Sequence, residues 1–306
     1  MHIFVTDPFE SLIPGHDSSL ALMREAILLN HPVHQSDLDS ISIQDNQLKV
    51  KARQIYLSEG SLIQKSESVE FNLSNEKQII VWMRKDPPVD HKYIVTCQIL
   101  RLAKCKVINN PNTLMSCDEK LFALEFPELI PQTTITSSIE EIKSIVSNKQ
   151  KVIVKPIGGK AGEGILVLNQ DDKNKSSIIE LLTEGGNRKI IVQQFLQEAE
   201  VGDKRIFLLN GDPVGVLLRV PSNDYRANMA AGGNIVKTEI TQAEYAICEQ
   251  LKPRIIELGL NIVGIDVIGN MLTEINITSP TCLEEINLLD GSNPAKKIIE
   301  WSQSII

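Results

Sequence analysis

A run of five consecutive apolar residues, Ile79 to Met83, constrains the fold of this chain more than any other feature. A strand that is apolar at every position must be covered on both faces, which is typical of a parallel sheet with helices on either side. The run ends in the charged loop Arg84-Lys85-Asp86-Pro87-Pro88, at the sheet edge where open α/β folds bind ligands. The pattern predicts a doubly wound parallel-sheet domain of the α/β class.

The flanking segments agree with this prediction. Residues 3–5 form a short apolar strand, and a loop leads from it to an apolar-periodic stretch over residues 20–29. Asp17 or Ser18 can cap a helix there. We further expect a helix over 93–103 and a strand over 106–109 that Pro111 ends. Residues 36–78 alternate between polar and apolar, which indicates short strands and turns.

The second half of the chain has a different pattern, which begins near residues 117–121. Two hairpins are predicted, one at Asn210-Gly211 and one at Gly269-Asn270, because both pairs favour tight turns. The expected helices are 120–126, 138–146, 176–182, 241–258 and 294–305. The expected strands are 151–156, 165–168, 190–195, 204–209, 212–220, 262–268 and 271–277.

Composition excludes several classes of function. The chain has 31 Lys and Arg against 39 Asp and Glu, a net charge of −8, so it carries no basic face for a nucleic acid. Aromatic residues are only 4%, too few for a base-stacking surface. No apolar run approaches the ~18 residues of a membrane span. Five cysteines without paired spacing predict free thiols, and hence a cytoplasmic protein. From the charge and the lack of a long apolar run we expect neither a nucleic acid nor a membrane as a partner.

A glycine-rich loop follows Lys155-Pro156, with glycines at 158, 159, 162 and 164. Such a loop exposes backbone N–H groups that can cover phosphate oxygens. It joins strand to strand and does not match GxxxxGK[ST], so a Walker-type loop fits poorly. We predict a β-loop-β lid in which Lys155 faces a phosphate; the alternative is a flexible hairpin with a surface lysine.

Asp266, Glu274 and Asn276 form a candidate metal site. Glu274 and Asn276 are two residues apart on one strand, so their side chains share a face. A turn at Gly269-Asn270 would bring Asp266 opposite them. Carboxylate and amide oxygens suit Mg²⁺, with Mn²⁺ as an alternative, and no His or Cys stands at zinc spacing. The competing interpretation is the polar outer face of a half-exposed hairpin.

Three arginines, Arg205, Arg219 and Arg226, stand at strand ends or just before the polar and glycine-rich stretch that includes Asn228. In an acidic chain, arginines beside a glycine-rich loop suggest clamps for carboxylate or phosphate groups. The alternative is that they are scattered, solvated surface residues.

Several segments together resemble a known family. They are KPIGGKAGEGI, QQFLQ, GDKR, LLRVP, RANMAAGGN and VGIDVIGNMLTEINITSPTC, preceded by MRKDPP, Tyr93 and Asp118-Glu119-Lys120. From about residue 4 to 290 the chain is similar to prokaryotic glutathione synthetases of the ATP-grasp superfamily. The resemblance implies an N-terminal domain over 1–119, a central ATP-grasp lobe with the lid over 120–200, and a C-terminal lobe with the metal site over 201–306.

The resemblance also implies roles for single residues. For ATP these are Lys120 and Lys155 at the phosphates, Gly159, Gly162 and Gly164 in the lid, Gln193, Gln194, Phe195 and Leu196 at the adenine, and Asn276. Asp266, Glu274 and Asn276 match the Mg²⁺ ligands. Arg205, Arg219 and Arg226 match residues lining the peptide and acyl-phosphate site, and Asn228 lies in a loop that closes over it. Ser279 and Thr281 match a turn near the substrate carboxylates.

The implied activity is ATP-dependent ligation of glycine to γ-glutamylcysteine through an acyl phosphate, by a homo-oligomer that we expect to be a tetramer. No histidine or cysteine is needed as a catalyst. The lid departs from the family pattern at Gly158, Lys160 and Glu163. Two alternatives stay open: another ATP-grasp amino-acid or peptide ligase, and an ATP-binding regulatory protein that has lost catalysis. Retention of all three metal-ligand positions disfavours the second.

Overall fold

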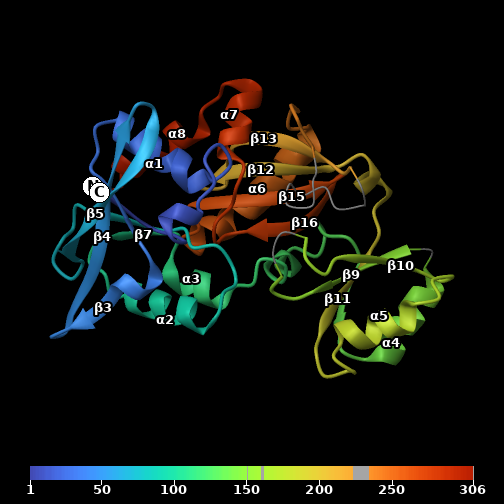
Figure 1. The fold of residues 1–306 in the computed structure, drawn as a ribbon. Coiled ribbons are helices and arrows are strands. Elements are labelled where there is room, and N and C mark those ends of the chain that lie inside the picture. The colour runs from blue at the N-terminus through green and yellow to red at the C-terminus, as the bar shows by residue number, and fades with distance from the viewer. Residues whose placement is uncertain (150, 160–161, 223–233, 306) are drawn as a thin grey trace.

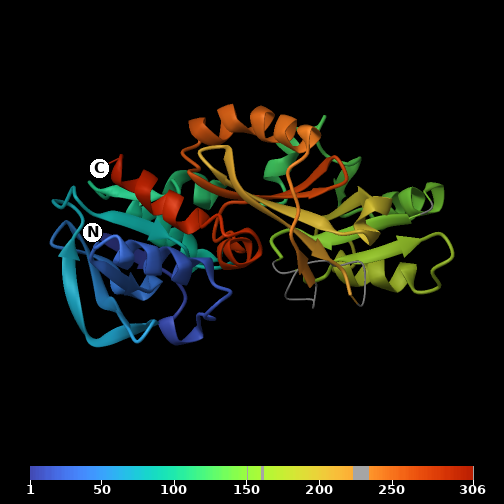
Figure 2. The same ribbon diagram turned by 90° about the horizontal axis from the view of Figure 1, so that it is seen from above.

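The computed structural model describes residues 1–149, 151–159, 162–222 and 234–305, which form three β-sheets along an elongated molecule (Figure 1). The N-terminal sheet lies at one end, the small second sheet at the other end, and the third sheet between them (Figure 2). This order brings loops from all three sheets toward the middle of the molecule.

Four neighbouring strands of the N-terminal sheet are parallel, in the order β2-β1-β6-β7, as the apolar run predicted. Successive residues of β1 face opposite layers: Ile3 and Val5 pack with α2 and α3, and Phe4 packs with α1. The strands of this sheet are β1 (His2–Val5), β2 (Val33–Ser36), β3 (Ile41–Gln44), β4 (Gln47–Ser58), β5 (Ser61–Asn72), β6 (Ile80–Met83) and β7 (Lys106–Ile108). The helices are α1 (Ser18–Leu28), α2 (His91–Leu100) and α3 (Pro111–Ser116).

One local prediction in this domain was wrong, and one helix was not predicted. Residues 36–78 do not form only short strands, because β4 and β5 make one antiparallel hairpin of two twelve-residue strands. Only β4 has a row of alternate buried residues that faces the core, whereas most residues of β5 are exposed, so the alternation of polar and apolar residues is weak in the second strand. Pro111 begins α3 behind the N-cap Asn110, since proline at the first helical position loses no intrahelical hydrogen bond.

The second sheet is small and antiparallel, with the strand order β10-β9-β11-β8. Alternate residues of β9, such as Val152 and Val154, face α4 and α5, which carry Ile142 and Ile179 into the same core. Its strands are β8 (Thr133–Thr136), β9 (Lys151–Pro156), β10 (Leu166–Asn169) and β11 (Ile190–Gln194), and its helices are α4 (Ile139–Asn148) and α5 (Lys175–Leu182).

The third sheet has the order β14-β13-β12-β15-β16 and carries both predicted hairpins. Ile206 and Leu208 face the core that contains α6, whereas Phe207 faces α7 and α8. The strands are β12 (Asp203–Leu209), β13 (Asp212–Val220), β14 (Asn234–Val236), β15 (Ile262–Ile268) and β16 (Met271–Asn276). The helices are α6 (Gln242–Glu257), α7 (Leu283–Asp290) and α8 (Pro294–Gln303).

The C-terminal helices do not stay with their own sheet alone, because α8 also packs against α1 of the N-terminal layer (Figure 1). The expected helix over 120–126 is a single 3-10 turn, η3 (Phe122–Glu125), and another turn, η4 (Gln197–Glu200), follows β11. Helix α7 was not predicted. The division at 119/120 and 200/201 stays a prediction. Within the described part of the chain, no helix is long and apolar enough to cross a membrane.

Candidate active site

A cavity of about 360 Å³ opens where the three sheets meet, and it is the frame for the candidate site. Its lining includes six of the side chains predicted to bind phosphate, metal or substrate, together with glycines of the predicted lid, and these come from segments far apart in the sequence. The six side chains are Lys120, Arg205, Arg219, Asp266, Glu274 and Asn276. The structure therefore brings most of the described candidates to one place.

The arginines sit opposite acids because of strand register. On β12 and β13, Asp203 is paired with Arg219, and on β12 and β15, Arg205 is paired with Asp266. Asp203 and Arg205 are two residues apart, so both side chains leave the same face of β12. The four charges thus form one patch on the sheet face toward the cavity.

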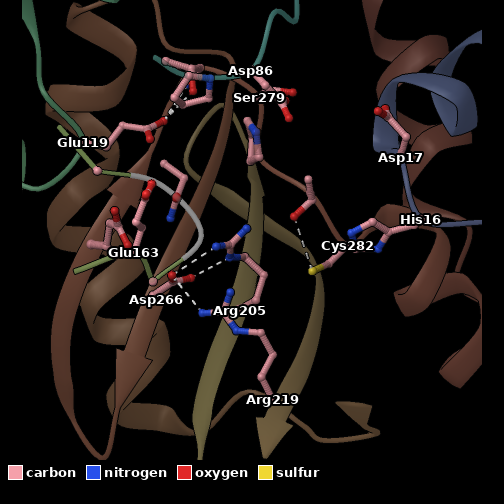
Figure 3. Close-up of a pocket in the computed structure, with 18 of the residues that line it drawn as sticks. His16, Asp17, Asp86, Glu119, Glu163, Arg205, Arg219, Asp266, Ser279 and Cys282 are labelled. Atoms are coloured by element: carbon pink, nitrogen blue, oxygen red, sulfur yellow. Dashed lines mark hydrogen bonds and ion pairs between the residues drawn. The ribbon is translucent and has the colours of Figure 1, made fainter. Parts of the chain in front are cut away.

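The four charges form a chain of ion pairs, and Figure 3 shows the part made by Arg205, Asp266 and Arg219. Arg205 donates from Nε to Asp266 Oδ1 at 2.5 Å and from Nη2 to Asp266 Oδ2 at 3.0 Å. Arg219 places Nη2 2.8 Å from the same Oδ2 and donates from Nε to Asp203 Oδ1 at 2.5 Å. Arg205, Arg219 and Asp266 are each 5% exposed. Such buried, charge-assisted pairs fix side-chain geometry strongly.

The network holds its groups in the charged form. Burial raises the pKa of Asp266, but the charges of Arg205 and Arg219 outweigh burial and keep that pKa well below its ordinary value. Burial lowers the pKa of Arg219, and the two acids reverse that effect and raise it. Asp203 is different, because burial dominates and its pKa is raised. The patch therefore presents fixed positive charge to the cavity beside a permanently ionised Asp266.

The candidate metal ligands lie on the β15–β16 hairpin as predicted. Asp266 is directly opposite Glu274, and Asn276 is opposite Gly264. The side-chain amide of Asn276 donates from Nδ2 to the Gly264 carbonyl at 3.1 Å, which leaves Oδ1 as the atom for a ligand. Glu274 Oε1 is 3.4 Å from Lys120 Nζ. The three oxygen-bearing side chains are thus neighbours on one surface.

These residues fit a hard cation by their donor chemistry. A carboxylate offers about four lone-pair positions, and the arginines use three on Asp266, so Oδ1 keeps one. Glu274 has Oε2 in addition to the oxygen near Lys120. Among the residues that the structure describes, no three His, Cys, Asp or Glu side chains are grouped to hold a metal. An amide oxygen must complete any such set here, and that favours Mg²⁺ over zinc.

Two lysines flank the acids. Lys120 donates from Nζ to the Gly159 carbonyl and is 8% exposed. Lys155 is 7% exposed, and its Nζ donates to Gln193 Oε1 at 3.2 Å. Burial lowers the pKa of Lys155, with Glu274 opposing and Lys120 adding to that effect. Both ammonium groups therefore sit in the electrostatic neighbourhood of Glu274.

The predicted lid and hinge are only partly at the cavity. Gly159 and Gly162 line it, whereas Gly164 packs against Pro156. None of the residues over 193–196 is among the described residues that line it. In that hinge the Gln194 N–H donates to the Gln132 carbonyl, Lys151 Nζ lies 5.0 Å from the Phe195 ring centroid, and Leu196 accepts from the Ala199 N–H. Arg226, Asn228 and Lys160 lie outside the described residues.

Sequence reasoning missed several lining residues. Glu119 Oε1 accepts from the backbone N–H of Ile277 at 2.7 Å and from Thr278 N at 2.9 Å, so it ties the start of η3 to the end of β16. Burial first, and then the charge of Glu274, raises the pKa of Glu119. Glu119 is part of the family motif Asp118-Glu119-Lys120, which could have indicated that it lies at the site, but no role was predicted for it. Asp86 and His16 also line the cavity, and neither was assigned.

Comparisons with known proteins agree with this arrangement. The family model described as prokaryotic glutathione synthetase, ATP-grasp domain, matches residues 119–291, and the model of the N-terminal domain matches residues 1–114. A glutathione synthetase from Gloeobacter violaceus is 41% identical, with 98% of this chain and 95% of that protein covered. One from Nostoc is 42% identical, with 97% and 96% covered.

Among solved structures, the crystal structure of a D-cycloserine synthetase has a TM-score of 0.66 at 11% identity and covers 99% of both chains. At that identity the likeness shows the shared fold alone, and it supports the predicted α/β architecture. The sequence matches show more than the fold, because they combine similar coverage with 41% and 42% identity. On this evidence the chain belongs to the prokaryotic glutathione synthetase family.

Proposed function

We propose that this chain is a glutathione synthase, an ATP-dependent ligase that joins glycine to γ-glutamylcysteine and releases ADP and phosphate. The observation that supports it most is the single cavity in which two buried arginines, an ionised aspartate and a lysine converge. That set suits a reaction between anionic partners. The relatives named glutathione synthetase, at 41% and 42% identity, supply the substrates.

The chemistry explains why such a site is needed. A carboxylate does not react with an amine at neutral pH, because its leaving group would be oxide. In the first step an oxygen of the cysteinyl carboxylate attacks the γ-phosphorus of ATP, the bond to ADP breaks, and an acyl phosphate forms. The glycine nitrogen then attacks the acyl carbon, loses a proton, and phosphate leaves as the amide forms. No protein nucleophile takes part.

The charged residues have separate tasks in this proposal. Lys120 and Lys155 hold phosphate oxygens of ATP, and Arg205 and Arg219 hold the reacting carboxylate and then the oxyanion on the acyl carbon. Asp266, Glu274 and Asn276 would hold Mg²⁺, which when bound offsets the negative charge of the transferring phosphoryl group. Arg226 and Asn228 are proposed for the same substrate site on the resemblance alone.

The glycines and the hinge complete the proposed site. Gly159, Gly162 and Gly164 belong to the loop that would cover the phosphates and exclude water from the acyl phosphate. Residues Gln193, Gln194, Phe195 and Leu196 would hold the adenine through their backbone. A cytoplasmic location and a homotetramer remain predictions from the sequence.

A coupled assay tests the proposal directly. Purified chain with ATP, Mg²⁺, γ-glutamylcysteine and glycine should release ADP and form a product of the mass of glutathione. Omission of either amino-acid substrate should stop product formation. Turnover with a different acceptor only would identify another ATP-grasp ligase. Binding of ATP without turnover on any acceptor would support a regulatory protein, and either result would overturn the proposal.

A further inference from the structure

Two polar residues that the proposed reaction does not use hold the open end of the β15–β16 hairpin. They are Asn109, which directly follows β7 of the N-terminal sheet, and Glu119, in the segment that leads from that domain to the second sheet. The last register pair of the hairpin joins Gly264 to Asn276, so Ile277 begins the segment beyond the pairing. Both polar residues contact the backbone there.

Asn109 bridges the two strands of the hairpin. Its Nδ2 donates to the carbonyls of Ile262 at 2.7 Å and of Ile277 at 2.8 Å, and its Oδ1 accepts from the Ile262 N–H at 2.8 Å. Ile262 is the first residue of β15, and Ile277 follows the last residue of β16. Asn109 is 3% exposed, so water has little access to these hydrogen bonds. Its amide therefore closes the hairpin beyond the last register pair.

Glu119 contacts the backbone on both sides of Asn276. Its own carbonyl accepts from the Ile275 N–H at 3.1 Å, and its Oε1 accepts from the Ile277 N–H at 2.7 Å. The same Oε1 accepts from Thr278 N at 2.9 Å and from Thr278 Oγ1 at 2.9 Å. The Glu119 side chain reaches this segment from the edge of the cavity (Figure 3). One residue therefore fixes the backbone immediately before and immediately after Asn276.

These contacts decide where the side chain of Asn276 points. Ile275 and Ile277 are fully buried, and side chains alternate along a strand, so Asn276 points the opposite way and lines the cavity. Its Nδ2 donates to the Gly264 carbonyl, which leaves Oδ1 for a metal. Mg²⁺ demands a near-octahedral set of oxygens at about 2.1 Å. A small shift of the backbone at Asn276 would therefore weaken the proposed metal site.

We propose that Asn109 and Glu119 are positioning residues for the metal site, which hold the backbone around Asn276 so that its Oδ1 meets the same Mg²⁺ as Asp266 and Glu274. The inference rests on the proposed function, of which this metal site is a part. In this role neither Asn109 nor Glu119 is a ligand. Side chains that hold a metal ligand in place commonly contribute about tenfold or more to metal affinity. The N-terminal domain then supports a site whose ligands all lie on the third sheet.

Amide hydrogen exchange tests the contacts without any ligand. In Glu119→Ala the Ile277 and Thr278 amides lose their acceptor, so they should exchange about tenfold faster or more. In Asn109→Ala the same should hold for the Ile262 amide. The amides of β11, in the second sheet, are the internal reference for a general loss of stability. Unchanged exchange of these amides relative to β11 would mean that the two side chains do not hold the segment, and it would overturn the inference.

Metal binding tests the consequence for the site. The probe is Mn²⁺, titrated into the chain with a saturating non-hydrolysable ATP analogue, and the free ion is followed by its electron paramagnetic resonance signal. Glu119→Ala should raise the Kd of Mn²⁺ about tenfold or more. Glu119→Gln keeps an oxygen for the same N–H donors, so it should raise that Kd less than about threefold. An equal loss in both variants would mean that the carboxylate itself binds the metal, and the positioning role would be wrong.

Asn109→Ala is the second variant, and Thr183→Ala is its matched control. Asn109→Ala loses all three hydrogen bonds of the amide and should also raise the Kd of Mn²⁺ about tenfold or more. Thr183 is fully buried as well, but its hydrogen bonds stay at the end of α5, so Thr183→Ala should keep the native Kd. The same rise in Thr183→Ala would show that the Kd follows general stability, and it would overturn the inference.

The native chain separates the two possible failures. If it makes glutathione and binds Mn²⁺ beside the nucleotide, but the Asn109 and Glu119 variants keep the native Kd, only the positioning role is wrong. If the native chain makes no glutathione or binds no Mn²⁺, the proposed function or its metal site fails first, and the positioning role falls with it.

Discussion

Arg205 donates hydrogen bonds to both carboxylate oxygens of Asp266, from Nε to Oδ1 at 2.5 Å and from Nη2 to Oδ2 at 3.0 Å. The pair spans β12 and β15, and both residues are 5% exposed. A residue proposed to hold the metal therefore forms an ion pair with a residue proposed to hold the substrate. The binding of nucleotide and of peptide should consequently depend on the same few atoms.

Asp266→Asn should lose both stability and activity, because it leaves Arg205 and Arg219 buried with one carboxylate fewer. Removal of one partner of a buried ion pair lowers the free energy of unfolding by about 3 kcal/mol or more. Urea unfolding should show a lower midpoint with an unchanged slope, and turnover should fall about a hundredfold or more. A variant of native stability would mean that the network is not the anchor that its distances indicate.

Glu274→Gln is the matched change on the facing strand. Glu274 has a side chain 24% exposed, and its nearest described cation, Lys120 Nζ, is 3.4 Å away. Such a loose pair adds little stability, under about 1 kcal/mol. We expect near-native unfolding but a loss of turnover of about a hundredfold or more, with Mg²⁺ required at higher concentration. Near-normal turnover would show that the proposed metal site is wrong.

Lys155→Met should weaken nucleotide binding without harming the fold. Removing a buried ammonium relieves a desolvation cost, whereas Gln193 Oε1 loses its donor, so the two effects on stability nearly cancel. Calorimetric titration with a non-hydrolysable ATP analogue should give a Kd about tenfold higher or more. Lys173→Met, in the exposed connection before α5, is the control. Equal affinity in all three proteins would remove Lys155 from the phosphate site.

Sequence reasoning succeeded where the relevant partners are close along the chain. The hairpin at Gly269-Asn270 was predictable from pattern, but the tight turn alone would pair Asp266 with Thr273. A register shift between Asp266 and Val267, which no local pattern indicates, places Asp266 opposite Glu274. The pairing of Arg205 with Asp266 joins strands about sixty residues apart, and no local pattern encodes their register. The same holds for Glu119, whose partners Ile277 and Thr278 lie across the fold.

Two other misses have physical causes. Helix α7 begins after Cys282, whose φ is +94° and whose side chain makes no capping hydrogen bond, so the usual N-terminal signal is absent from the sequence. His16 lines the cavity and contacts Glu285 of α7, which is 269 positions away in the sequence. Both depend on long-range packing, which composition and periodicity do not encode.

Gly164→Ala should cost more stability than Gly185→Ala. Both glycines have positive φ, +71° and +67°, so alanine is strained at either place by about 1–2 kcal/mol. At 185 a Cβ would meet no atom within 4 Å, but at 164 it would lie 2.9 Å from Cδ and Cγ of Pro156. We expect an extra loss of about 1 kcal/mol or more at 164 in urea unfolding. Equal losses would show that β9 and the glycine loop are not in contact there.

His2 should make the stability of the chain fall as the pH drops below neutrality. Burial, then the positive N-terminus and His31, lowers the pKa of His2 from 6.5 to about 3. Its Nδ1 accepts from Trp82 Nε1 at 3.0 Å, and a protonated ring could not accept that bond. The neutral form is therefore the folded form, and its contribution is complete above pH 6.5 and is lost as pH falls toward 3.

The size of this effect can be separated from other acid effects by substitution. One such group changes the free energy of unfolding by up to about 1.4 kcal/mol per pH unit inside that window. His2→Gln keeps an acceptor for Trp82 and cannot titrate, so the slope of unfolding free energy against pH between 6 and 4 should become shallower. His91→Gln, on the exposed start of α2, should keep the native slope. If His2→Gln also keeps the native slope, the His2 ring can be protonated in the folded chain. The hydrogen bond from Trp82 Nε1 to His2 Nδ1 would then not hold the ring neutral.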